Sequence, residues 1–376
     1  MNTLYKLGFV IEQVLGHITH GQNLKRVVAQ DQDVEAHWIL PSWQTQGLAG
    51  KIPVYKSNWT VHAGLQARSS IAKLQRQVAL DGLFFHTQVP SILAQKWVRR
   101  FPTVISLDAT PLQYDRLGDF YDHETGPSWL ETKKWQMNVD SFQAARHLVT
   151  WSEWAKQGLI DEYEVAPEKI SVIPPGVITQ DWQRPFPPSF SAAQAPCQIL
   201  FVGGQFARKG GPVLLEAFRR LRYRLASEGW GETAVSLHLV TQDQLPAEPG
   251  VVIYNHMKPN SPELKNLFHT SHIFCLPTYG DCLPMVLSEA GASWLPLVST
   301  SVAAIPEIVR EAHSGLLVPP GDAESLENAL YQLATQPEMR RQLGENAQKL
   351  VVSRYDAAQN AGELLTLLKE VTQKAN

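Results

Sequence analysis

The fold of this chain is decided by the stretch Gln198-Ile-Leu-Phe-Val-Gly-Gly-Gln-Phe-Ala-Arg-Lys-Gly-Gly211. A short apolar run ends at Val202, a glycine-containing loop follows, and an amphipathic stretch covers 211–225. Parallel sheets covered by helices are built from units of this kind, a strand that passes through a loop into a helix. The stretch therefore predicts an α/β domain with a parallel sheet.

The same alternation of short apolar runs and longer amphipathic stretches continues through both halves of the chain. In the first half the predicted strands are 7–11, 36–40, 82–86, 104–107, 147–151 and 170–173. In the second half they are 198–202, 236–240, 251–254, 273–276 and 297–299, with helices at 211–225, 284–293, 323–335 and 357–371. We predict two doubly wound Rossmann-like domains that face each other across a cleft lined by the carboxyl ends of the strands.

Prolines mark the predicted boundary between these domains. The segment 174–196 contains too many of them for a packed helix or a central strand. We therefore predict an N-terminal domain over 1–178, a linker over 179–196 and a C-terminal domain over 197–354. The last segment, 355–376, is predicted as a helix, for which a return to the N-terminal domain is one option.

Composition excludes several classes of protein. The chain has 376 residues, 44% of them apolar, and a formal net charge of -3 without a concentrated basic segment, which argues against nucleic-acid binding. The three cysteines follow no disulfide or zinc pattern. No apolar run approaches the roughly 18 residues of a membrane helix, and the N-terminal stretch around Glu12 is interpreted as a strand rather than a signal peptide. These features predict a cytoplasmic protein without a transmembrane segment.

The glycine loop is the first candidate binding segment. Gly203 and Gly204 allow backbone amides to approach phosphate oxygens, and Arg208 and Lys209 add positive charge where a leaving diphosphate develops negative charge. The alternative is an ordinary loop before a helix, with two solvated cations.

The second candidate segment is Leu276-Pro-Thr-Tyr-Gly-Asp-Cys-Leu-Pro-Met-Val-Leu-Ser-Glu-Ala-Gly-Ala292. A proline suits the first turn of a helix, so the amides there should point toward an anion such as a diphosphate; the residues concerned are Cys282, Leu283, Pro284 and Met285. Glu289 could accept hydrogen bonds from a ribose diol, and Asp281 could hold a sugar hydroxyl. Alternatively, Asp281 is an N-terminal cap and Glu289 a surface acid.

Together these segments resemble the retaining glycosyltransferases of family four, which have two Rossmann-like domains in the GT-B architecture. The resemblance spans most of the chain and is carried by Val172-Ile-Pro-Pro-Gly-Val177, the loop 203–210, the spacing of Asp281 and Glu289, and Gly315-Leu-Leu-Val-Pro-Pro-Gly-Asp322. It implies an enzyme that moves a hexosyl group from a UDP- or GDP-sugar to an acceptor hydroxyl that the sequence does not name.

The resemblance also implies roles for single residues. Lys209 would bind the donor diphosphate, Glu289 the ribose, and Asp281 the donor sugar together with the amides of Cys282 and Leu283. Because these cations and amides would neutralise the leaving group, neither a metal nor a cofactor is expected. Retention by front-face attack is implied in the same way, since no carboxylate stands out as a nucleophile.

The chain departs from the family pattern at three positions. Asp281 stands where glutamate is common, Cys282 where glycine is common, and Gly204 where arginine is frequent, which leaves Arg208 as a candidate compensation. These departures keep two alternatives open, namely a non-catalytic nucleotide-sugar-binding subunit and an epimerase or phosphorylase of the same fold.

The first half offers candidates for the acceptor side. His86 and Gln88 end a strand where similar enzymes often carry His-x-His, so His86 could hold the donor sugar or position the acceptor. The segment 16–23 is predicted to be a loop that approaches the substrates, and Asp108 and Thr110 end another strand; the candidate acceptor contacts of the loop are Gly16, His17, His20 and Asn23. Structural histidines and ordinary loop composition are the alternatives.

One further segment, Trp97-Val-Arg-Arg-Phe101, mixes basic and aromatic residues. Such a mixture is found where proteins touch a membrane surface, so a peripheral membrane contact is one interpretation. A solvated helix end is the other. The sequence indicates no oligomeric state.

Overall fold

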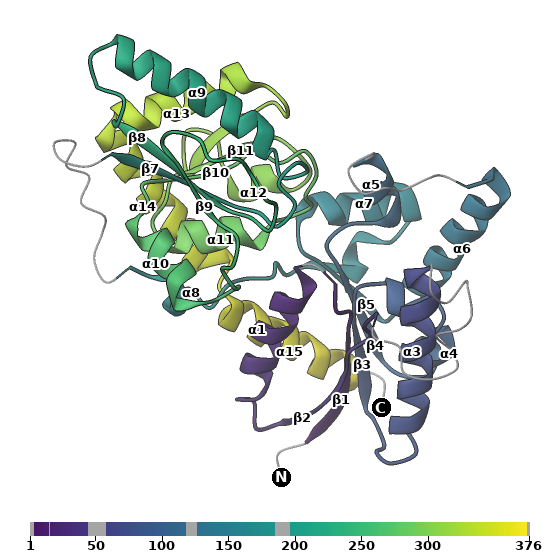
Figure 1. The fold of residues 1–376 in the computed structure, drawn as a ribbon. Helices are drawn as coiled ribbons and strands as arrows, with labels where there is room; N and C mark the ends of the chain where they lie inside the picture. Colours follow the sequence, from purple (N-terminus) through teal and green to yellow (C-terminus); the bar gives the residue numbers. More distant parts are fainter. Residues whose placement is uncertain (1–3, 15, 44–57, 118–125, 185–195, 374–376) are drawn as a thin grey trace. The chain divides into compact units, whose positions relative to one another are not determined.

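The computed structural model describes residues 4–14, 16–43, 58–117, 126–184 and 196–373 (Figure 1). The chain divides into two compact units. The first contains the described residues of Met1–Arg116, Asp122–Pro175 and Ala357–Asn376, and the second contains those of Leu117–Tyr121 and Gly176–Asp356.

The first unit is a six-stranded parallel sheet in the order β2-β1-β3-β4-β5-β6. Its strands are β1 (Tyr5–Ile11), β2 (Val34–Ile39), β3 (Gly82–His86), β4 (Thr103–Leu107), β5 (His147–Thr150) and β6 (Ile170–Val172). Its α-helices are α1 (His17–Val28), α3 (Trp59–Leu74), α4 (Gln95–Arg100), α5 (Pro111–Arg116), α6 (Ser128–Ala144), α7 (Glu153–Tyr163) and α15 (Ala357–Gln373). Ile11 pairs with His86, and His86 with Ser106, so the strands end at a common edge.

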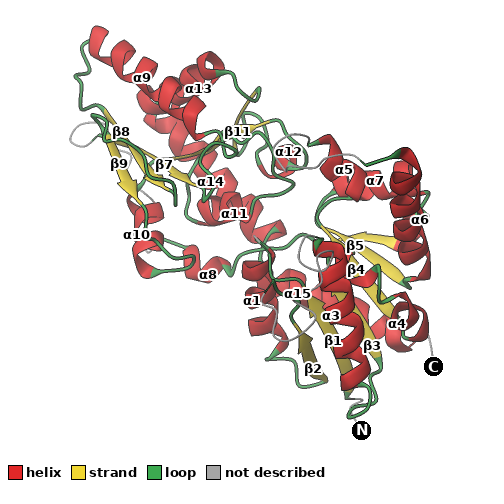
Figure 2. Ribbon diagram, turned by 45° about the vertical axis from the view of Figure 1, so that its right-hand side comes forward, coloured by secondary structure: helices red, strands yellow, loops and turns green. Residues whose placement is uncertain are grey.

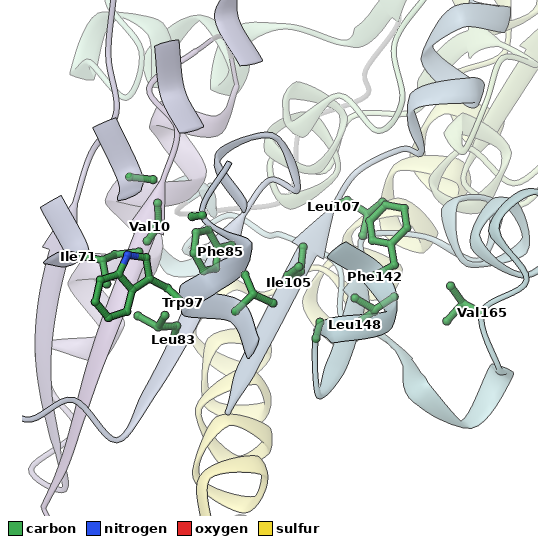
Figure 3. Close-up of a cluster of buried hydrophobic side chains, with 14 of the residues drawn as sticks. Val10, Ile71, Leu83, Phe85, Trp97, Ile105, Leu107, Phe142, Leu148 and Val165 are labelled. Atoms are coloured by element: carbon green, nitrogen blue, oxygen red, sulfur yellow. The ribbon is translucent and has the colours of Figure 1, made fainter. Parts of the chain in front are cut away.

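Alternating strand residues build a separate apolar core on each face of this sheet, because successive side chains point to opposite sides. Val10, Phe85 and Ile105 point to one face, where they pack with residues of α3, α4 and α6 (Figure 3). Phe9 and Phe84 point to the other, where they pack with α1 and α15. The sheet is thus covered by helices on both faces, as a parallel sheet requires (Figure 2).

The second unit is also a six-stranded parallel sheet, in the order β12-β11-β10-β7-β8-β9. Its strands are β7 (Cys197–Val202), β8 (Val235–Val240), β9 (Val251–Tyr254), β10 (Ile273–Leu276), β11 (Leu297–Thr300) and β12 (Gly315–Val318). Its α-helices are α8 (Thr179–Trp182), α9 (Gly211–Ser227), α10 (Pro262–Thr270), α11 (Met285–Ala292), α12 (Ile305–Ile308), α13 (Ala323–Thr335) and α14 (Pro337–Arg354). The predicted α/β class with two Rossmann-like sheets is confirmed.

The structure differs from the sequence-based expectation in three elements. The predicted loop 16–23 is helical from His17 onward, because α1 buries His17, Leu24 and Val28. Strand β12 was not predicted, although its residues lie in the motif Gly315-Leu-Leu-Val-Pro-Pro-Gly-Asp322. Within the predicted linker, α8 forms and buries Trp182 against Phe268, with ring centroids 5.1 Å apart; residues 185–195 of that linker lie outside the described residues.

The described helices include none that is both long enough and apolar enough to span a bilayer.

Candidate functional site

Two loops of the second unit interlock at the carboxyl edge of its sheet. The loop after β7 reaches Gly210, which has a φ of +77°, and a Cβ there would lie 1.8 Å from the carbonyl oxygen of Pro277. The amide of Tyr279 donates to the carbonyl of Arg208 at 3.0 Å. Glycine is therefore required at position 210 both for its backbone conformation and for the approach of the loop after β10.

This interlock brings together three charged residues that are far apart in sequence. Lys209 Nζ lies 2.6 Å and Arg208 Nη1 3.2 Å from Oδ1 of Asp281, while Thr278 Oγ1 donates to Oδ2 at 2.6 Å. Burial alone would raise the pKa of Asp281, but the charges of Lys209 and Arg208 and these hydrogen bonds lower it below its usual value. Two cations thus converge on one carboxylate.

The N-cap alternative for Asp281 is wrong. Asp281 does not cap α11, whose N-cap is Pro284 and whose cap makes no side-chain hydrogen bond. Both of its carboxylate oxygens are also occupied by Lys209, Arg208 and Thr278. Its observed contacts hold the two cations in place.

Helix α11 begins one residue later in the sequence than predicted. The helix starts at Met285, so Pro284 precedes the first turn and Cys282 and Leu283 lie before it, both buried. The carbonyl of Cys282 accepts a hydrogen bond from Ala304 at 3.1 Å. Of the predicted amides, only that of Met285 belongs to the first turn, where N–H groups lack partners within the helix.

Two more donor-side candidates can be placed. Gly203 allows close packing, since a Cβ there would lie 2.9 Å from Cγ of Lys209. Gly204 is exposed, and a Cβ there would have Gln242 at 3.9 Å as its nearest neighbour. The absence of a side chain at Gly204 is thus not imposed by packing, whereas Gly203 supports the position of Lys209.

Glu289 is half-buried inside α11 rather than fully exposed. Poor access to water raises the pKa of its carboxyl group to about 7, against the opposing charge of Lys265. A carboxyl group whose pKa is raised by poor solvation is typical of a binding or catalytic position.

A second polar cluster lies at the carboxyl edge of the first sheet. His17 Nδ1 is 2.8 Å from Oε1 of Glu12, and His17 Nε2 is 3.4 Å from Oδ2 of Asp108. Tyr114 donates to the same Asp108 oxygen at 2.5 Å. Burial lowers the pKa of His17, but the hydrogen bonds and charges of Asp108 and Glu12 outweigh it and raise this pKa to about 10. His17 is thus an imidazolium held between two carboxylates.

His86 and His20 lie beside this imidazolium. The His86 ring stacks on Trp151 at 4.8 Å, and its centroid is 4.8 Å from those of His17 and His20. Burial and the charge of His17 lower the pKa of both neighbours, to about 3 for His20 and well below the usual value for His86. Both are neutral at pH 7, and His86 covers a face of Trp151 that could otherwise stack on a sugar.

The remaining first-unit candidates do not form one group. Gln88 is buried at the start of the 3-10 helix Val89–Ser91, and its Oε1 has no hydrogen-bond partner in the described structure. Gly16 precedes α1 and is exposed, and Asn23 is half-buried on α1. Thr110 has a structural role, since its hydroxyl donates to Glu162 and accepts from the amide of Gln113.

The residues 97–101, for which a membrane-surface patch and a solvated helix end were the two interpretations, lie at the end of α4. Trp97 is buried in the core and its Nε1 donates to the carbonyl of Arg68, while the basic groups of Lys96 and Arg100 lie over its ring. Phe101 packs on the same core. The ring of Trp97 is therefore not available for a membrane surface.

Sequence reasoning missed four residues of these clusters: Glu12, Thr87, Tyr114 and Thr278. Glu12 follows β1 directly and accepts hydrogen bonds from Thr87 at 3.0 Å and Trp59 at 3.0 Å. Its place after a strand was the signal that could have identified it. Among the described residues, no group of three or more His, Cys, Asp or Glu side chains is arranged to hold a metal ion.

Comparison with known families gives one match in each half of the chain. The family described as Glycosyltransferase Family 4 matches residues 19–181, and the one described as Glycosyl transferases group 1 matches residues 186–350. The chain belongs to the family-four glycosyltransferases with the GT-B fold.

Individual members of this family are only distantly similar. An MMP alpha-(1->4)-mannosyltransferase of Mycolicibacterium hassiacum is 28% identical over 215 residues, which is 54% of this chain and 49% of that protein. The chain thus spans about half the length of the curated relatives it matches.

Solved structures show the same fold. A sucrose-phosphate synthase from Thermosynechococcus elongatus superposes with a TM-score of 0.75 at 14% identity, over 98% of this chain and 100% of that one. Anabaena HepE in complex with UDP has a TM-score of 0.67 at 13% identity, over 98% and 100% of the two chains.

Proposed function

We propose that this family-four glycosyltransferase moves a hexosyl group from a nucleotide-diphosphate sugar to an acceptor hydroxyl, with retention of anomeric configuration. The observation that carries the proposal is the convergence of Lys209 and Arg208 on Asp281 beside the N-terminus of α11. The two cations and the helix amides suit a diphosphate that becomes more negative as it leaves.

The other donor contacts follow from the same loops. Glu289 lies in α11, eight positions after Asp281 in the sequence, and would accept bonds from the ribose. UDP is the first nucleotide to test, because HepE, which shares the fold, is described in complex with UDP. The proposal of retention rests on membership of the family. The proposal that no metal is needed rests on the two cations, which could neutralise the leaving group.

The direct test is release of nucleoside diphosphate from UDP-glucose, UDP-N-acetylglucosamine and GDP-mannose, with and without EDTA. We expect release from at least one donor, unchanged by EDTA, and NMR of the product should show the donor's anomeric configuration. Lack of binding and turnover with all three donors would contradict the proposal, and inversion would contradict its stereochemical part.

Lys209→Ala provides the matching site test. If Lys209 stabilises the leaving group, its loss should raise the barrier by about 2 to 4 kcal/mol, or ~30- to 1,000-fold in kcat. Arg220→Ala is the control, because Arg220 is exposed and pairs only with Glu216 one helical turn away among its observed ion pairs. An unchanged kcat for Lys209→Ala would remove this residue from the site.

A further inference from the structure

Five buried polar atoms among the described residues at or near the carboxyl edge of the first sheet lack hydrogen-bond partners. Two of them are Oε1 of Gln88 and Oγ1 of Thr150, and the other three are Oδ1 of Asp108, Nε2 of His86 and Nε2 of His20, which belong to one cluster of side chains. An unsatisfied buried polar atom costs about 1–3 kcal/mol. Three of them in one cluster indicate that a ligand completes the hydrogen bonding.

Asp108 and His86 both lie against the ring of His17, and His20 lies against the ring of His86. Asp108 contacts His17 through its other oxygen at 3.4 Å, and the His86 ring lies 4.8 Å from both the His17 and the His20 rings. The residues come from the ends of the neighbouring strands β3 and β4 and from α1, which follows β1. In open parallel sheets this edge is where ligands bind.

The charges of this cluster restrict what can bind. Glu12 and Asp108 contribute two carboxylates and His17 one imidazolium, which sums to -1, while His86 and His20 are neutral. A carboxylate oxygen only accepts hydrogen bonds, whereas a neutral imidazole nitrogen either donates or accepts, according to its tautomer. The complementary ligand group therefore donates to Asp108 and carries no negative charge, as a hydroxyl group does.

A phosphate or carboxylate group would fit this place poorly. It would bring a second anion against Oδ1 of Asp108 in a buried site, where like charges repel strongly. The imidazolium of His17 offers little compensation, because both of its nitrogens already contact carboxylates.

We propose that Asp108 selects an acceptor with an uncharged, hydroxyl-rich face, such as a sugar or polyol, and rejects one that presents a phosphate or carboxylate there. One acceptor hydroxyl donates to Oδ1 of Asp108, and the same or a neighbouring hydroxyl bonds to Nε2 of His86. This inference rests on the proposed function, since it assigns the bound hydroxyl to the acceptor.

Glu12 provides a matched control. It is the second carboxylate on His17 and equally buried, but its oxygens are occupied by His17, Thr87 and Trp59. Glu12→Gln and Asp108→Asn remove the same charge from the cluster, yet only Asp108→Asn removes the unpartnered oxygen. Thermal unfolding of both variants would show whether each of them still folds.

The experiment compares neutral compounds with their phosphate esters: glucose with glucose 6-phosphate, and myo-inositol with its monophosphate. Binding to the wild-type chain is titrated by calorimetry in the presence of UDP. We expect at least tenfold tighter binding of the neutral member of at least one pair. Asp108→Asn should reduce this preference at least tenfold through tighter binding of the ester, whereas Glu12→Gln should change it less than threefold.

Three results would overturn the inference: tighter binding of the phosphate esters, binding of no compound from either pair, or equal shifts in the two variants. If Asp108→Asn does not fold, His86→Phe replaces it, and this variant should lose neutral-ligand binding at least tenfold. Failure of the proposed function can be told apart from failure of this inference. The first appears as absence of nucleotide release from the donor, whereas the second appears in acceptor binding, which is measured without turnover.

Discussion

Glu289 is a residue whose position costs stability, which makes its role testable. Its pKa of about 7 lies above the usual value of 4.5, so the folded chain binds this proton more tightly than the unfolded chain. Below pH 4.5 the carboxyl group is protonated in both the folded and the unfolded chain, so it does not lower the free energy of unfolding. As the pH rises from 4.5 through 7, the unfolded chain loses this proton first, and the free energy of unfolding falls.

Glu289→Gln should therefore stabilise the protein at pH 8, by about 1–3 kcal/mol, and have little effect at pH 4.5. The same variant should bind UDP at least about tenfold more weakly, since hydrogen bonds to a charged group contribute about 1.5–3 kcal/mol. Urea unfolding at the two pH values and calorimetry with UDP measure both effects. A stabilised variant with unchanged UDP affinity would disprove the ribose role.

His17 has the opposite pH dependence. Its pKa of about 10 lies above the usual 6.5, so its stabilising contribution is fully present below pH 6.5 and is lost as the pH rises through about 10. His17→Asn should cost about 3–5 kcal/mol at pH 6, because it leaves two buried carboxylates without their cation. At pH 10.5 the cost should be much smaller. Equal costs in urea unfolding at both pH values would show that His17 is not the cation of this cluster.

Most strands were predictable from the sequence, whereas the chemistry of both sites depended on the fold. A short apolar run between breakers identifies β9 or β10 locally, since the signal is contained in the strand itself. Helix α1 was missed because Gly16, Gly21 and Asn23 resemble a turn, while packing of Leu24 and Val28 on the sheet favours the helix. Nor could the sequence show that Lys209 meets Asp281, 72 positions away.

At the scale of elements, the interlock of the loops after β7 and β10 positions the residues of the proposed donor site. Gly210→Ala should combine the strain of a positive φ, about 1–2 kcal/mol, with a clash against Pro277 that adds about 1–3 kcal/mol. Gly229 is the matched control, with a φ of +83° and nothing within 4 Å of an added Cβ. Thermal unfolding should show a larger loss for Gly210→Ala, and UDP binding should fall only in that variant. An equal loss of stability in Gly210→Ala and Gly229→Ala would mean that the two loops move apart freely.

At the scale of the whole molecule, the last helix belongs to the first unit. Helix α15 buries Leu364, Leu365 and Leu368 in the core formed with β1 and β3, and Lys369 pairs with Asp31 at 2.8 Å. The core of the first unit is therefore complete only when α15 has been synthesised. Because each sheet has its own core, unfolding need not be a single two-state transition.

Hydrogen exchange should reveal these separate cores. Leu365→Ala removes a buried side chain from the first unit, and Leu330→Ala removes one from α13 in the second. Each should cost about 2–5 kcal/mol, so stability alone would not tell them apart. Leu365→Ala should lower amide protection in β1, β3 and β4, more than 250 positions earlier in the chain, and leave β7, β8 and β10 protected. Leu330→Ala should do the reverse. Loss of protection in all six strands with either variant would show instead that the two units unfold as one.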